Sequence, residues 1–164
     1  MHALERWDVQ VEALALVLRE RGLHLATAES CTGGLIAAAC TSIAGSSDWF
    51  ERGVVSYSNE AKTELLGVPA ALITRHGAVS AEVACAMAEG ALVYSTADLS
   101  LSVTGVAGPS GGTANKPVGT VWLALARRGE DAQASLLQLK GNRAEVREQT
   151  VDRALQALLT ALTS

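Results

Sequence analysis

Residues 23–43 read LHLATAESCTGGLIAAACTSI, and this stretch sets the predicted architecture. Leu23 to Ala28 is a short apolar run, which predicts a buried strand, and a turn with two adjacent glycines follows it. The Ala-rich run from Leu35 to Ile43 predicts a helix, with Ser30 or Thr32 as its N-cap. A strand, a glycine turn and a helix N-terminus in this order are a frequent ligand site, because backbone N–H groups converge there on an anion.

Strands and helices interleave through the rest of the chain. Apolar residues at helical spacing predict five further helices. The first covers residues 3–21 and ends at Gly22, the second runs from Asn59, its cap, to Leu66, and a short third begins at Pro69. The fourth runs from Ser80, its cap, to Val93, and Asn142 caps the last. Alternating apolar residues predict strands at residues 53–57, 99–104, 120–126 and 132–139, of which the last two form an antiparallel hairpin. We therefore expect an α/β fold, a single domain over residues 1–164 in three layers, with a mixed sheet of about five strands flanked by helices.

The strand at residues 99–104 is expected to have one apolar and one polar face. Its sequence alternates apolar with hydroxyl side chains, namely Leu99, Ser100, Leu101, Ser102, Val103 and Thr104. A glycine-rich loop from Gly105 to Gly119 follows, and it matches neither the Walker nor the Rossmann phosphate-binding pattern. A loop of this length is more often a lid or a binding loop than a plain connector.

Composition excludes several classes of protein. The chain has 164 residues, of which 49% are hydrophobic and 18% charged, which excludes disorder, collagen and coiled coil. A net charge of −4 and an aromatic content of 4% argue against a nucleic-acid partner, so any anionic ligand must be held by a local site. Three cysteines without a CxxC pair fit neither a disulfide framework nor a metal site. No leader or membrane span is apparent, so we expect a cytoplasmic protein with no membrane partner.

Two neighbouring side chains in the glycine turn are candidate nucleophiles. Ser30 would be exposed on the turn, although ordinary N-capping is an equally good interpretation of it. Cys31 is the rival, because a helix N-terminus activates a thiolate. A serine nucleophile needs a base, and His76 is the only histidine expected in a loop. Lys62 would serve instead if it were partly desolvated, whereas a solvated lysine paired with Glu60 or Glu64 is the commoner outcome.

Two arginines on the last predicted helix are candidate anion ligands. Arg143 and Arg147 are four residues apart, so they lie on one helix face and would hold one anion together. The alternative is a solvated face in which they pair with Glu145 or Glu148. Spacing alone favours the solvated face.

Six stretches together resemble one family. In chain order they are residues 29–34 (ESCTGG), 57–62 (YSNEAK), 77–80 (GAVS), 104–109 (TGVAGP), 116–119 (KPVG) and 141–143 (GNR). Their order is similar to that of the CinA carboxy-terminal domain family, the nicotinamide-nucleotide amidohydrolases, over nearly the whole chain. The resemblance implies the stand-alone amidase form, which converts nicotinamide mononucleotide and water into nicotinate mononucleotide and ammonia in pyridine-nucleotide salvage.

The resemblance also implies roles for individual residues. Ser30 matches the nucleophile of the family, while Lys62 and Tyr57 match the groups that move its proton. Main-chain N–H groups at Thr32, Gly33 and Gly34 would then hold the oxyanion. The substrate phosphate needs a local cradle, for which the candidates are Thr104, Gly105, Gly108, Lys116 and Arg143. No metal or other cofactor is implied, and a homodimer or higher homo-oligomer is expected.

The same family leaves an alternative of another class. Some of its members are linked to competence and to recombination proteins. The chain would then be a non-catalytic nucleotide-binding or regulatory domain, which retains ligand without turnover and is indifferent to the loss of Ser30.

Overall fold

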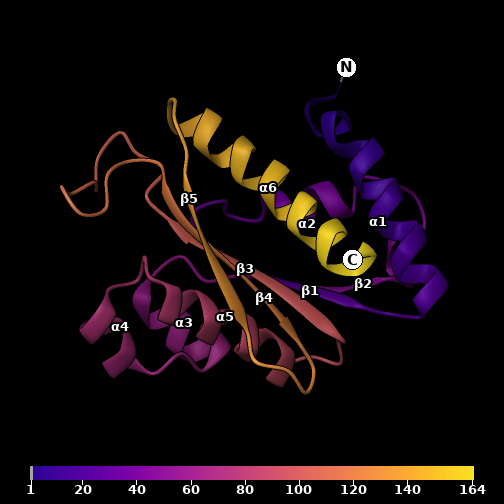
Figure 1. Cartoon of the computed structure of the whole chain (residues 1–164), viewed down its shortest axis with the longest axis horizontal. Coiled ribbons are helices and arrows are strands. Elements are labelled where there is room, and N and C mark those ends of the chain that lie inside the picture. Colours follow the sequence, from indigo (N-terminus) through magenta and orange to yellow (C-terminus); the bar gives the residue numbers. More distant parts are fainter. Residues whose placement is uncertain (1) are drawn as a thin grey trace.

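The computed structural model, which describes residues 2–164, contains a five-stranded sheet with helices on both faces (Figure 1). The strand order is β2-β1-β3-β4-β5, and the strands are β1 (Leu25–Glu29), β2 (Phe50–Val55), β3 (Leu99–Gly105), β4 (Thr120–Arg127) and β5 (Gln133–Gln138). β1 is parallel to β2 and β3, whereas β4 is antiparallel to β3 and β5. The predicted mixed sheet and its C-terminal hairpin are therefore confirmed.

Helices cover both faces of this sheet (Figure 1), and an apolar core lies under each helical layer. One core packs under α1 (Asp8–Arg21), α2 (Leu35–Cys40) and α6 (Arg143–Thr163). The other packs under α3 (Asn59–Leu66), α4 (Ala70–His76) and α5 (Ala81–Val93). The short 3₁₀ helices Ala3–Trp7 and Ser46–Asp48 complete the elements. The three predicted layers are thus a helical layer on each face of the sheet. Within residues 2–164 the structure contains no helix with the length and apolar character that a membrane crossing needs.

The predicted strand with alternating apolar and hydroxyl side chains is β3, and its hydroxyl side chains are buried rather than open to solvent. Ser100 Oγ and Ser102 Oγ each donate to a main-chain carbonyl of α5, at Ala88 and Ala84, over 2.6 Å. These small side chains let α5 pack closely on the sheet, and their hydrogen bonds satisfy the polar groups that this burial removes from water.

Most predicted helix ends are confirmed, and the cap of α3 is corrected. Gly22, Ser80 and Asn142 occupy the predicted cap positions, and the Asn142 side chain accepts from the main chain of the last helix. The N-cap of α3 is Ser58 rather than Asn59, because the Ser58 hydroxyl accepts from the third residue of the helix. The predicted helix at residues 3–21 begins with a 3₁₀ segment before α1.

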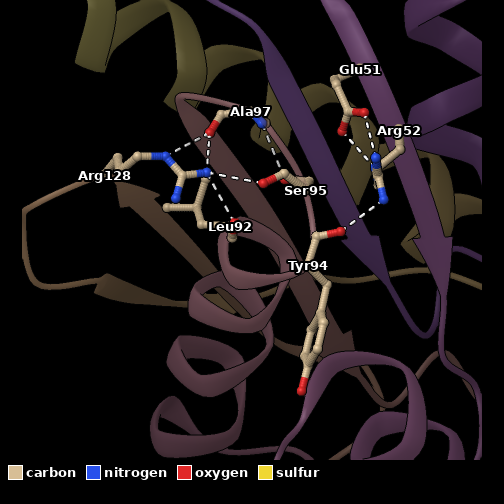
Figure 2. A network of polar contacts seen from close by, with 7 residues as sticks. All are labelled: Glu51, Arg52, Leu92, Tyr94, Ser95, Ala97 and Arg128. Carbon is tan, nitrogen blue, oxygen red and sulfur yellow. Dashed lines mark hydrogen bonds and ion pairs between the residues drawn. The ribbon is translucent and has the colours of Figure 1, made fainter.

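A polar network anchors the end of the sheet that lies away from the carboxyl ends of β1–β3 (Figure 2). The Arg128 guanidinium donates to the carbonyls of Leu92 and Ala97, at 2.9 and 2.6 Å, at the end of α5 and in the loop before β3. Arg52, paired with Glu51, donates to the carbonyl of Tyr94 at 2.7 Å. These contacts satisfy carbonyls at a helix C-terminus, so the network stabilises the fold.

Parallel pairing brings three loops together at the opposite end of the sheet. Glu29, the last residue of β1, pairs with Val55 of β2 and with Val103 of β3. The segments that follow β1, β2 and β3 therefore leave the sheet side by side. Ligands of open α/β sheets bind at such carboxyl ends, where crossover connections diverge to opposite faces.

Candidate active site

A cavity of about 300 Å³ lies beyond these carboxyl ends. Its lining comes from the segments after β1 and β2, from the end of β3 and the loop after it, from the start of α3, from residues 78–79 and from the first residue of α6. Lys62 and Arg143 are the basic side chains of the lining, which contains no carboxylate. The cavity is therefore suited to an anionic ligand, although the chain as a whole carries a net charge of −4.

The structure brings Ser30 and Lys62 together. The Nζ atom of Lys62 lies 3.1 Å from the Oγ atom of Ser30. Ser30 extends the sheet by one residue, since its N–H donates to the carbonyl of Val103 at 3.1 Å. Lys62 reaches it from the first turn of α3 across 32 residues of sequence, and both side chains line the cavity.

Burial and the absence of a paired carboxylate within residues 2–164 favour a neutral amine at Lys62. Only 1% of the residue is exposed, and burial lowers the pKa of its side chain from the ordinary value of 10.5. Its Nζ lies 3.1 Å from the carbonyl of Ser56 and 3.4 Å from that of Tyr57, and no carboxylate of residues 2–164 pairs with it. A neutral amine donates two N–H bonds to these carbonyls and keeps its lone pair for the Ser30 hydroxyl. The solvated lysine paired with Glu60 or Glu64 is not observed.

Glu29, which the sequence analysis did not single out, holds the turn that carries Ser30. Its carboxylate is fully buried and accepts from Thr32 Oγ1 at 2.5 Å and from the N–H groups of Ile36 and Ala37 at 2.9 and 3.0 Å. The predicted capping of α2 by Ser30 or Thr32 is therefore wrong, because Glu29 takes the first free N–H groups of the helix. The signal was a carboxylate placed between an apolar strand and a glycine turn.

The rival candidates are placed unfavourably for catalysis. Cys31 lines the cavity, but burial raises the pKa of its thiol to about 12, so the thiol stays protonated at neutral pH. His76 lies outside the cavity lining, and its ring faces Glu82 at 3.7 Å. The amine beside Ser30 is therefore that of Lys62, and no histidine of the described residues lines the cavity.

Four of the eight predicted binding residues line the cavity, namely Thr104, Gly105, Gly108 and Arg143. The glycine turn lies outside it. Thr32 is held by Glu29, the N–H of Gly33 donates to the Ser30 carbonyl at 2.9 Å, and Gly34 is the N-cap of α2 with a φ of 102°, which favours glycine. These three residues therefore fix the conformation of the turn and do not line the cavity.

Lys116 and Arg147, the other basic candidates, connect neighbouring segments through hydrogen bonds to main-chain carbonyls. Lys116 Nζ donates to the carbonyl of His76 at 3.0 Å and so fastens the loop after β3 to the end of α4. Arg147 donates to the carbonyl of Thr32 at 2.9 Å, outside the cavity, so Arg143 and Arg147 do not converge on one anion. Neither arginine forms the ion pair with Glu145 or Glu148 that a solvated helix face predicts; the Glu148 carboxylate pairs with Arg6.

The hydroxyl of Tyr57 contacts Arg143. Arg143 Nη2 donates to Tyr57 Oη at 2.9 Å, and Nη1 donates to the carbonyl of Gly108 at 2.8 Å. Lys62 meets Tyr57 only at its main-chain carbonyl. Asn59 also lines the cavity, a contribution that its position at the start of a predicted helix did not reveal.

Comparisons with known proteins agree with this architecture. The sequence model of the family described as CinA C-terminal domain matches residues 8–162. A CinA-like protein of Citrifermentans bemidjiense is 58% identical over 147 residues, which cover 90% of this chain and 35% of that protein. The nicotinamide-nucleotide amidohydrolase PncC of Escherichia coli strain K12 is 48% identical over 147 residues, which cover 90% of this chain and 89% of that protein. The chain thus spans about a third of one relative and most of the other.

Solved structures share the fold. The competence/damage inducible protein CihA from Agrobacterium tumefaciens is 46% identical with a TM-score of 0.87, and the match covers 94% of this chain and 96% of that one. A competence-damaged protein (CinA) superfamily protein from Escherichia coli is 34% identical with a TM-score of 0.91, over 98% of this chain and 93% of that one. The predicted fold class is therefore confirmed by comparison as well.

Proposed function

The chain belongs to the CinA C-terminal domain family, and on this premise we propose that it hydrolyses nicotinamide mononucleotide to nicotinate mononucleotide and ammonia, a step of pyridine-nucleotide salvage. The observation that carries the proposal is the 3.1 Å separation of Ser30 Oγ and Lys62 Nζ, in a cavity whose lining contains no carboxylate. The relative from Escherichia coli, which aligns over most of both chains, supports the substrate class.

The first half of the reaction forms an ester on Ser30. The hydroxyl of Ser30 gives its proton to neutral Lys62 while Oγ attacks the carbon of the carboxamide. The tetrahedral intermediate then loses its C–N bond, and the Lys62 ammonium returns the proton to the departing nitrogen, which leaves as ammonia. The nicotinoyl group remains bound to Oγ.

The second half releases the acid and restores the serine. Water gives a proton to Lys62 and attacks the ester carbon, the bond to Oγ breaks, and Lys62 returns the proton to Ser30. The Lys62 amine thus accepts and returns one proton in each half, which requires its pKa to lie closer to neutrality than that of a solvated lysine.

The negative charge of the substrate phosphate suits Arg143, the basic residue of the cavity that takes no part in proton transfer. Arg143 projects from the start of α6 into the cavity lining, where the predicted phosphate ligands Gly105 and Gly108 also lie. A guanidinium remains charged at every working pH and matches the geometry of a phosphate. We assign Arg143 to the phosphate, and Lys116 only to the loop that carries Gly108.

Release of ammonia from nicotinamide mononucleotide by the purified chain tests the proposal. Ser30→Ala should lower kcat by at least about 10³-fold. Ser47→Ala is the matched control, because Ser47 is exposed and lies outside the cavity lining. A chain that binds the nucleotide without turnover would instead be the regulatory domain, and its affinity would not respond to Ser30→Ala.

A further inference from the structure

The Tyr57 side chain stands beside the candidate proton path without joining it. Its only side-chain hydrogen bond within residues 2–164 is the one that its hydroxyl accepts from Arg143 Nη2 at 2.9 Å. The residue is 60% exposed, and it follows β2 at the mouth of the cavity. Lys62 already lies within 3.1 Å of Ser30 Oγ, so a direct proton transfer between them needs no phenol as a bridge.

The Arg143 guanidinium is held from two sides. Nη2 donates to Tyr57, in the segment after β2, and Nη1 donates to the carbonyl of Gly108, in the loop after β3. A guanidinium has five N–H donors, so three remain after these two contacts. No carboxylate of residues 2–164 lies within ion-pair distance of Arg143. A charged group with free donors is thus fixed in the cavity lining.

We propose that Tyr57 is a positioning residue for Arg143: its hydroxyl holds the guanidinium at the cavity, sets the affinity for the anionic group of the substrate, and takes no part in proton transfer. The assignment rests on the proposed function for the identity of the substrate. It differs from the role in moving the serine proton that the family resemblance implies for Tyr57.

Steady-state kinetics of Tyr57→Phe with nicotinamide mononucleotide test this assignment. Loss of the hydroxyl frees the guanidinium on one side, and we expect KM to rise by about tenfold, equivalent to about 1.4 kcal/mol, with kcat and its pH profile within about twofold of wild type. Tyr94→Phe is the matched control, since Tyr94 is the other tyrosine, is 55% exposed, and its hydroxyl forms no hydrogen bond within residues 2–164.

A double-mutant cycle separates positioning from proton transfer. If Tyr57 acts through Arg143, Tyr57→Phe has no further effect on KM in an Arg143→Met background. A proton-transfer role predicts instead a fall in kcat of about 10²-fold or more that persists in that background, and this result overturns the proposal. Unchanged kinetics in Tyr57→Phe overturn it as well.

Calorimetry tests the positioning role of Tyr57 independently of turnover, because it measures ligand binding alone. Nicotinate mononucleotide and inorganic phosphate are titrated into the wild-type chain and Tyr57→Phe, and the variant should bind each about tenfold more weakly. If the wild type shows no turnover but this difference holds, the proposed function fails and the positioning role stands. Equal affinities of the two proteins, or no saturable binding to the wild type, overturn the positioning role.

Discussion

Replacement of Glu29 by alanine would remove the group that holds the nucleophile turn. The buried carboxylate accepts three hydrogen bonds, from Thr32 Oγ1 and from the N–H groups of Ile36 and Ala37. A hydrogen bond to a charged group contributes about 1.5–3 kcal/mol, and the cost of burying the charge offsets part of the sum. We therefore expect Glu29→Ala to lower the free energy of unfolding by about 3–5 kcal/mol. Glu29→Gln keeps one acceptor oxygen and should cost about half as much.

Urea unfolding followed by tryptophan fluorescence measures this loss, since Trp7 and Trp49 are buried. Glu145→Ala is the control, because Glu145 is an exposed carboxylate at a helix N-terminus. It forms a capping box by accepting from the Asn142 N–H at 3.0 Å. Such a cap contributes about 1 kcal/mol. If Glu29→Ala cost no more than Glu145→Ala, the carboxylate of Glu29 would not be holding the turn, and our account of it would be refuted.

Three further outcomes follow from the structure. Lys62→Met should lower kcat by about 10³-fold or more, whereas Lys140→Met, at an exposed lysine, should leave kcat unchanged. In the wild type kcat/KM should fall as the pH falls through the lowered pKa of Lys62, because the ammonium accepts no proton. A pH-independent rate from pH 5 to 10 would contradict this. Iodoacetamide at about pH 8 should leave Cys31 unlabelled in the native protein and label it in urea, as mass spectrometry would show, since burial raises the pKa of this thiol to about 12. Arg128→Met should lower the unfolding free energy by about 1 kcal/mol without changing KM, whereas Arg127→Met, which loses no side-chain hydrogen bond, should leave both unchanged.

Local patterns sufficed to predict most elements, but not where buried polar groups lie. The strand, glycine turn and helix of residues 23–43 follow from apolar periodicity and glycine placement. The alternation of Ser100 and Ser102 with leucines is equally typical of a solvent-facing strand, and only the packing of α5 on that face turns it into a buried one. The capping role of Glu29 was hidden for a related reason, since a fully buried carboxylate is rare unless it is paired.

The candidate site was predictable in residue type more than in placement. The sequence proposed Ser30 and Lys62, but their separation of 32 residues is closed only by the parallel pairing of β1 with β2 and by α3, which follows β2. Charge alone did not separate Lys116 from Arg143 as phosphate ligands. The structure separates their positions, because the loop after β3 directs Lys116 to α4, whereas the start of α6 directs Arg143 into the cavity lining.

The two basic side chains of the cavity, Lys62 and Arg143, are not interchangeable, and their residue types follow from the tasks we propose for them. A base beside Ser30 must be able to lose its charge, and burial lowers the pKa of Lys62 where no carboxylate of the described residues pairs with it. An arginine in the place of Lys62 would keep its charge and accept no proton. The group that holds a phosphate must instead stay charged and present several donors in a fixed plane, which Arg143 does between Tyr57 and the Gly108 carbonyl. A lysine in the place of Arg143 would offer one charged centre instead of a planar group that two segments hold, so the cavity needs one basic residue that can lose its charge and one that keeps it.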